Sequence, residues 1–202
     1  MRQFLSAKAL IGFALVALVV LVAILAPVFI PAERATQMVM TARLQPPSLE
    51  YPLGTDQLGR DLLARVMLGA QTSLTIAVLA VGMSILLGLP LGIVSGYFGG
   101  RIDNVLMRVI DALLSFPVLL LALTISAVLG PNLQNTVIAI GVAFTPFLAR
   151  IVRGEALRVV QMPYVEAARA AGTRDGQMIV RHILPNIMPA LIVQATISLA
   201  FA

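Results

Sequence analysis

The chain has 202 residues, of which 59% are hydrophobic and only 11% are charged, and its formal net charge is +5. Soluble domains are about 45–50% apolar and about 25% charged, and a water-soluble core of this size cannot bury so much apolar surface. The composition therefore excludes a soluble enzyme and predicts an all-α, polytopic transmembrane helical bundle. Cysteine is absent and His182 is the single histidine, so a thiolate or His-rich metal cluster within the chain is excluded.

Residues 9–30 form an uncharged apolar stretch. A helix rises about 1.5 Å per residue, so this stretch is long enough to cross a bilayer core of about 30 Å. A signal peptide is the alternative, because Arg2 and Lys8 precede the stretch. The stretch exceeds the roughly 7–15 apolar residues of a signal peptide, and Pro27–Pro31 lacks a small-residue cleavage pattern. We therefore predict a retained first transmembrane helix.

The rest of the chain is predicted to form one transmembrane domain with the first helix. An extracytoplasmic segment is predicted at 31–68, followed by three spans at 72–98, 105–129 and 133–149. A cytoplasmic loop at 150–186 and a partial fifth span at 187–202 complete the sequence. The last apolar run is shorter than the roughly 17–25 residues of a usual span. We therefore expect the sequence to be C-terminally truncated inside its fifth helix.

The distribution of arginine and lysine predicts the orientation. If the N-terminus is cytoplasmic and the sides alternate at each span, ten of the fourteen basic residues lie in cytoplasmic segments and four lie outside. The nine acidic residues divide five to four, so the net positive charge lies on the inner side. We predict that the N-terminus and the 150–186 loop face the cytoplasm.

Small residues recur every four positions in the second span, at Ser84, Gly88, Gly92 and Gly96. On a helix this spacing forms one face along which another helix backbone can approach closely. The simpler alternative is that membrane helices are generally rich in glycine. We predict a helix-packing face, while the sequence leaves open whether its partner is in this chain or in another.

The cytoplasmic loop contains the pattern of a helix–turn–helix elbow. Pro163 fits the first turn of a helix, and Gly172 fits the left-handed position just beyond its end. A second short helix is predicted to begin at Thr173 and to end before Pro185. A loop of this length in a chain with otherwise short turns suggests a docking element.

One face of the first elbow helix is lined mostly by small side chains and carries Tyr164, Ala167, Ala168 and Ala171. Such a face can enter a groove of another protein, and Glu166 adds one directed charge that Arg169 can pair with. The alternative is an amphipathic helix lying on anionic lipid. The elbow helix lacks the large apolar side chains of such helices, so docking onto a protein is favoured.

The pattern Glu166-Ala-Ala-x3-Gly172-x11-Leu184-Pro185 resembles the EAA loop of ATP-binding-cassette importer permeases. His182 stands where that family often has an aliphatic residue. Five further segments look like the dipeptide, oligopeptide and nickel branch of this family, and most like its C-type permease subunit: Leu53–Asp61, Gly96–Gly100, Met107–Asp111, Val152–Arg153 and Arg181–Asn186.

The resemblance implies a type I importer permease of the bacterial inner membrane, with no catalytic or metal site, that carries di- or oligopeptides or a related small solute. The implied partners are a B-type permease, two cytoplasmic ATPase subunits that bind ATP and Mg, an extracytoplasmic solute-binding protein and membrane lipid, without nucleic acid. The segment Pro31–Leu68 is expected to meet the binding protein. ATPase coupling is implied for Tyr164, Glu166, Ala167, Ala168, Ala171, Gly172, His182, Leu184, Pro185 and Asn186.

The residues themselves agree that this chain does not hydrolyse ATP, because no Gly-x4-Gly-Lys-Ser/Thr phosphate loop occurs. No cofactor is expected on this chain. A secondary carrier without an ATPase is the main alternative, although it predicts mid-span charges that are scarce here. An intramembrane hydrolase would need a nucleophile–base pair or a zinc motif, and neither occurs.

Two further sites have alternative interpretations. The motifs Gly54–Asp56 and Gly59–Asp61 could bind a metal or a phosphate, but turns and ion pairs between subunits are favoured because only two carboxylates are present. His182 could be a ligand or a general base. Without a second histidine, a structural hydrogen bond at the junction of loop and helix is favoured.

Overall fold

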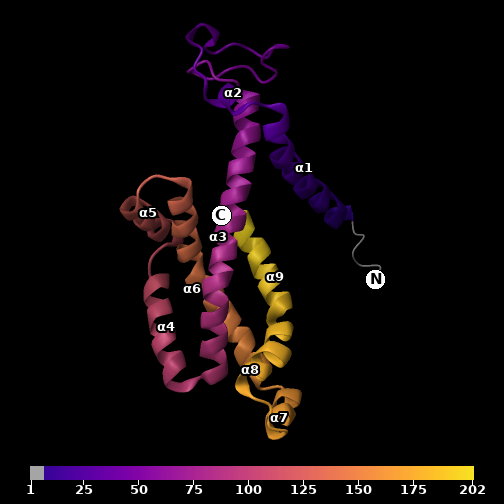
Figure 1. Ribbon diagram of the computed structural model, residues 1–202, viewed down its shortest axis with the longest axis vertical. Helices are drawn as coiled ribbons and strands as arrows, with labels where there is room; N and C mark the ends of the chain where they lie inside the picture. The colour runs from indigo at the N-terminus through magenta and orange to yellow at the C-terminus, as the bar shows by residue number, and fades with distance from the viewer. Residues whose placement is uncertain (1–6) are drawn as a thin grey trace. The chain divides into compact units, whose positions relative to one another are not determined.

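The computed structural model describes residues 7–202, which are mostly helical, with no strand in that range beyond an isolated bridge between Thr55 and Asp61. The helices follow one another along the chain (Figure 1), with a short 3-10 helix at Met40–Ala42 and a π-helix at Ile179–Ile183. The α-helices are α1 Ala7–Phe29, α2 Ala32–Thr36, α3 Leu62–Phe98, α4 Gly100–Leu114, α5 Val118–Leu129, α6 Leu133–Val160, α7 Pro163–Ala170, α8 Asp175–Met178 and α9 Leu184–Phe201.

The helices confirm an all-α, multi-pass membrane protein. Four of them are long and apolar enough to cross a membrane, and α4 with α5 adds a fifth span if the bent pair counts as one. The four are Leu10–Phe29, Leu62–Phe98, Leu133–Val160 and the continuous stretch Asp175–Phe201. Arg2, which contributes to the predicted orientation, lies outside the described residues.

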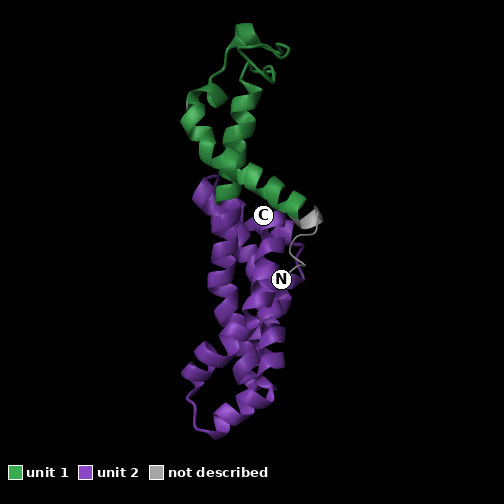
Figure 2. Ribbon diagram, turned by 90° about the vertical axis from the view of Figure 1, so that its right-hand side faces the viewer, with its two compact units in different colours: residues 1–75 green, residues 76–202 purple. Residues whose placement is uncertain are grey.

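Contacts divide the chain into two compact units, residues 1–75 and 76–202 (Figure 2). The boundary lies within α3, so it separates two regions of a chain that the sequence predicts as a single domain. In the first unit, the segment that precedes α3 folds mainly on itself, through the turns between Val39 and Asp61. The second unit contains the candidate functional site.

The small-residue face of α3 packs against α6 of the same chain. Ser84 is fully buried, and a Cβ atom added at Gly88 would lie 3.0 Å from the carbonyl oxygen of Thr145. At Gly92 an added Cβ would lie 2.6 Å from both the Ala149 oxygen and the Val152 Cβ. The absence of side chains at these positions therefore allows the two helix backbones to approach closely.

Two helices extend beyond the apolar runs that predicted them. α3 begins at Leu62 rather than at residue 72, because a carboxylate oxygen of Asp61 accepts hydrogen bonds from the N–H groups of Leu63 and Ala64. α6 continues to Val160 rather than ending at residue 149. The added turns of α6 are amphipathic, since Val152, Ala156 and Val159 are buried while the charged side chains between them are not.

Prolines have different effects at two other places. The predicted span 105–129 is broken by Ser115–Pro117 into α4 and α5, which meet at 88°. A residue that precedes proline is disfavoured in the helical region, which accounts for the break. The predicted helix end before Pro185 is wrong, because the π-helix Ile179–Ile183 leads directly into α9 with Pro185 in its first turn.

Candidate functional site

The elbow consists of α7, the turn at Gly172, and α8. The predicted caps of α7 are confirmed: Pro163 lies in its first turn, and Gly172 has a φ of 81° just beyond its end. The N–H of Gly172 donates to the Arg169 oxygen, and the N–H of Thr173 donates to the Ala168 oxygen. This pair of bonds is a Schellman motif, which requires a left-handed residue and so favours glycine.

The inner side of the elbow is anchored in the core of the second unit. Val165 of α7 is 1% exposed, and Met178 and Ile183 beyond the turn are fully buried. They belong to one apolar cluster with Val152 and Val159 of α6. The elbow is therefore fixed to the end of α6 by burial on both sides of its turn.

The outer side of the elbow is open. Tyr164 is 43% exposed, and Glu166, Ala167 and Ala171 are exposed as well, whereas Ala168 is half-buried and turned toward the core. The remaining residues of the predicted coupling loop lie at the turn or at the junction with α9: Gly172, Pro185 and Asn186 are exposed, and His182 and Leu184 are half-buried. The structure thus presents a short helix with small, exposed side chains.

His182 lies at the junction between elbow and span. Its ring centroid is 6.5 Å from that of Tyr164, and its backbone oxygen accepts a hydrogen bond of 2.6 Å from the Asn186 side chain. This bond involves the backbone rather than the imidazole. Among the described residues no group of three or more potential ligands that could hold a metal ion is present.

Tyr97, in the last turn of α3, binds both arms of the elbow, and the sequence did not point to this contact. Its hydroxyl donates a hydrogen bond of 2.6 Å to Asp175 of α8, and the Arg169 guanidinium of α7 lies 5.7 Å from its ring centroid. The sequence allowed Arg169 to pair with Glu166, but Arg169 lies over the tyrosine ring instead. The only signal for Tyr97 in the sequence is its place in the Gly96–Gly100 motif.

A second polar cluster joins α3, α4 and α6 near the same end. Both Nε and a terminal nitrogen of Arg153 donate to the carboxylate of Asp103, at 2.5 and 2.6 Å, and the Ser95 hydroxyl donates to the same carboxylate. Arg150 forms an exposed ion pair with Asp111. Arg153 and Asp111 belong to the family-like motifs, and each pairs with a residue outside them.

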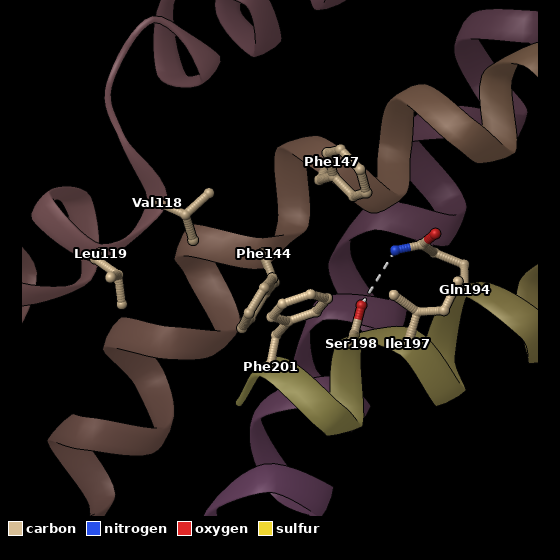
Figure 3. A pocket seen from close by; sticks show the side chains of 8 residues that line it. All are labelled: Val118, Leu119, Phe144, Phe147, Gln194, Ile197, Ser198 and Phe201. Carbon is tan, nitrogen blue, oxygen red and sulfur yellow. Dashed lines mark hydrogen bonds between the residues drawn. The ribbon is translucent and has the colours of Figure 1, made fainter.

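A cavity of about 380 Å³ lies between α5, α6 and α9 (Figure 3). Its wall is apolar except for Gln194 and Ser198, whose side chains share a hydrogen bond of 3.3 Å. Phe144 of α6 and Phe201 of α9 are among the side chains that line it, as Figure 3 shows. Gln194 is 8% exposed, so a buried amide is placed beside an apolar chamber.

The motif Leu53–Asp61 forms a loop in the first unit that is held by hydrogen bonds and ion pairs of Asp56. Asp56 accepts hydrogen bonds from the N–H groups of Leu58 and Arg60, at 2.8 and 3.0 Å, and forms ion pairs with the guanidinium groups of Arg60 and Arg65. Desolvation raises the pKa of Asp56, but the backbone and side-chain hydrogen bonds from Arg60 and Leu58 outweigh it and lower the pKa to about 2. The carboxylate is therefore occupied within its own chain.

Glycine is required in this loop by a close approach. Gly59 has a φ of 74°, and an added Cβ would lie 1.9 Å from the backbone oxygen of Val39. Thr55 is buried, donates to the Ala42 oxygen and accepts from the Gln45 N–H at 2.8 Å. These contacts show that the motif forms a tight turn within the first unit.

Two family comparisons agree with this architecture. Residues 88–202 match the family described as the binding-protein-dependent transport system inner membrane component. Residues 1–47 match the N-terminal TM domain of oligopeptide transport permease C.

Individual relatives extend the likeness over most of the chain. A putative peptide transport system permease protein of Brucella suis biovar 1 is 46% identical over 192 residues, which are 95% of this chain and 64% of that protein. The dipeptide transport system permease protein of Alkalihalophilus pseudofirmus is 39% identical over 96% of this chain and 64% of its own length. The oligopeptide transport system permease protein of Bacillus subtilis is 36% identical over 100% of this chain and 66% of its own length. The chain thus spans about two thirds of the length of these relatives.

Proposed function

Because the chain belongs to the family of binding-protein-dependent transport system inner membrane components, we propose that it is a non-catalytic permease subunit of an ATP-driven importer. It is a multi-pass protein of the inner membrane, and its relatives are named as permeases for peptides. Di- or oligopeptides are the substrate class that these names favour. ATP and Mg are bound by separate ATPase subunits, and this chain contributes to the transmembrane path.

The elbow carries the coupling part of this proposal. Val165 and Met178 hold its inner side in the core, while Glu166, Ala167 and Ala171 remain exposed. A surface of small side chains lets a helix enter the groove of a partner, and one carboxylate gives the contact direction and specificity. The partner for this face is the cytoplasmic ATPase, whose movement reaches the membrane helices through the buried side of the elbow.

The cavity between α5, α6 and α9 supports a second part of the proposal, a contribution to the translocation path. Solutes with peptide groups need hydrogen-bond partners when they leave water. Gln194 and Ser198 provide such partners in a wall that is otherwise apolar. A B-type permease completes the path, and a solute-binding protein delivers the substrate to the segment that includes the Leu53–Asp61 loop.

The first experiment is a mild-detergent pull-down of the full-length protein from its native membrane, with the partners identified by mass. We expect a second permease and a chain with a phosphate-loop motif to copurify. Recovery of the protein alone, or only as a homo-oligomer, would contradict the importer and favour a secondary carrier.

The elbow assignment is tested by Glu166→Ala and Gly172→Asp in the same pull-down. An added Cβ at Gly172 meets no atom within 4 Å, and aspartate is one of the few residues that visit the left-handed region, so the outer surface gains a charge at the cost of a strained turn. We expect ATPase recovery to fall at least about tenfold, as for other interfaces that lose a central charge contact or gain a repulsive one.

Gly154→Asp is the matched control for the elbow variants. Gly154 is an exposed glycine of α6 whose added Cβ also meets no atom within 4 Å, so the same charge is introduced outside the elbow. This variant should retain the ATPase. Equal retention by Gly172→Asp and by Gly154→Asp would refute the docking role of the elbow.

A further inference from the structure

The two arms of the elbow are both held by one side chain from a distant helix. Tyr97 is 9% exposed in the last turn of α3. Its ring lies under Arg169, which precedes the Gly172 turn, and its hydroxyl binds Asp175, which follows the turn. A glycine turn between two short helices is a natural point of bending, and Tyr97 bridges it.

These contacts differ in kind from the apolar packing around them. The cluster that contains Val165 and Met178 resists separation from α6, but dispersion and hydrophobic contact are not directional and permit sliding. The hydrogen bond from the Tyr97 hydroxyl to the Asp175 carboxylate, at 2.6 Å, is charge-assisted and directional. It fixes the orientation of α8 relative to the end of α3, although the two residues are 78 positions apart.

The end of α3 is held in turn by the neighbouring polar cluster. Ser95, half a turn before Tyr97, donates to Asp103, which is paired with Arg153 of α6 in a two-bond contact. The end of α3 is thus bound to the elbow through Tyr97 and to the polar cluster through Ser95. An element fixed on both sides transmits displacement instead of absorbing it, because packed and hydrogen-bonded elements have few intermediate arrangements.

We propose that Tyr97 is the positioning residue that joins the elbow to α3, so that α7 and α8 move as one body and carry the ATPase-driven displacement directly into α3. The proposal rests on the proposed function, because it needs an ATPase to move the elbow. It goes beyond that function by assigning the connection to one hydroxyl group and by making the Gly172 turn a rigid corner.

Tyr97→Phe tests the hydroxyl alone, because phenylalanine keeps the buried ring and its contact with Arg169. The measurement uses the full-length protein copurified with its partners and a pair of nitroxide labels at Leu86→Cys on α3 and Ile192→Cys on α9. Both positions are exposed, at 73% and 58%, and the chain has no cysteine of its own. The distance between the labels is measured by pulsed electron paramagnetic resonance without nucleotide and with Mg-ATP and vanadate.

We expect nucleotide to change the label distance in the parent protein. Tyr97→Phe and Asp175→Ala should reduce the population at the new distance by about two- to thirty-fold, the range of couplings carried by packed networks. Asp175→Asn should restore the change, since its amide oxygen still accepts from the hydroxyl. Glu155→Gln is the control, because it removes an ion pair on the surface of α6 that joins no second element.

A merely structural role of Tyr97 would lower the melting temperature and leave the nucleotide-driven distance change at its parent size. That result, or an absence of any change in the parent protein, would overturn the proposal. ATPase copurification is recorded for every variant, so that failure of the joint is distinguished from failure of the importer. A retained ATPase with an unaffected distance change contradicts only the role of Tyr97.

Discussion

Asp56 shows how one carboxylate can organise a loop whose residues are adjacent in sequence. It accepts hydrogen bonds from the backbone at Leu58 and Arg60 and faces two guanidinium groups, so all of its partners favour the ionised form. The pKa is lowered from 3.8 to about 2, which means that the loop holds its proton less tightly when folded than when unfolded. The resulting stability is complete above pH 3.8 and is lost as the pH falls through about 2.

We predict that the Leu53–Asp61 loop resists pepsin at pH 4 and becomes cleavable as the pH falls toward 2. In Asp56→Asn the stabilising charge is absent at every pH, so cleavage should already be fast at pH 4. Rates of loop cleavage are followed by mass spectrometry on the detergent-solubilised protein. Glu50→Gln, an exposed position in the same segment, should behave like the parent; loss of protection in Glu50→Gln to the same extent would exclude the specific role of Asp56.

At the scale of the elements, the contact of α3 with α6 depends on the absence of side chains. An added methyl at Gly92 would meet the Ala149 oxygen and the Val152 Cβ, both at 2.6 Å, and a helix backbone cannot move aside as a flexible side chain can. We predict that Gly92→Ala lowers the free energy of unfolding by about 1–3 kcal/mol, the usual cost of overpacking. SDS-induced unfolding followed by circular dichroism measures this change.

Gly82→Ala is the control for this packing prediction. Gly82 lies on the same helix, is exposed, and has no atom within 4 Å of an added Cβ. Alanine should there be neutral or stabilising by up to about 1 kcal/mol, through its higher helix propensity. Equal destabilisation by the two substitutions would mean that glycine acts through the flexibility of α3 and not through the contact with α6.

The elements differ in how far the sequence could predict them, and the reason is the range of the interaction. The caps of α7 depend on Pro163 and Gly172, which act within one turn of the helix, and both were predicted. The end of α6 was missed because an apolar run does not reveal helical turns that are amphipathic, such as those with Val152 and Val159 buried. The helix end predicted before Pro185 was wrong because Pro185 stands in the first turn of α9, where a helix tolerates proline.

The polar contacts of the candidate site were beyond prediction for a related reason. Tyr97 and Asp175 are 78 positions apart, and Asp103 and Arg153 are 50 apart, so no local pattern links either pair. Of these four residues only Tyr97 and Arg153 lie in the family-like motifs, and the motifs do not say what a residue contacts. The docking and coupling roles of Glu166 and its neighbours stay predictions, because they concern surfaces that meet other chains.

At the scale of the whole molecule, the distribution of charge bears on orientation. Ten of the fourteen basic residues lie in segments assigned to the cytoplasm, and six of these are in the stretch from Arg150 to Arg181. Positively charged segments are retained on the cytoplasmic side during insertion. α6 has 28 residues and is about 42 Å long, so its two ends can lie on opposite sides of a membrane.

This orientation predicts that the elbow is reachable only from the cytoplasm. The protein has no cysteine, so Ala167→Cys introduces a unique thiol on the exposed side of α7. A membrane-impermeant maleimide should leave it unlabelled in intact cells and label it in inverted vesicles. Leu133→Cys, at the opposite end of α6 and 45% exposed, should show the reverse pattern. Labelling of Ala167→Cys from outside, with Leu133→Cys protected, would show that the predicted topology is inverted. The elbow would then lie on the side of the membrane opposite to the one on which ATP is hydrolysed.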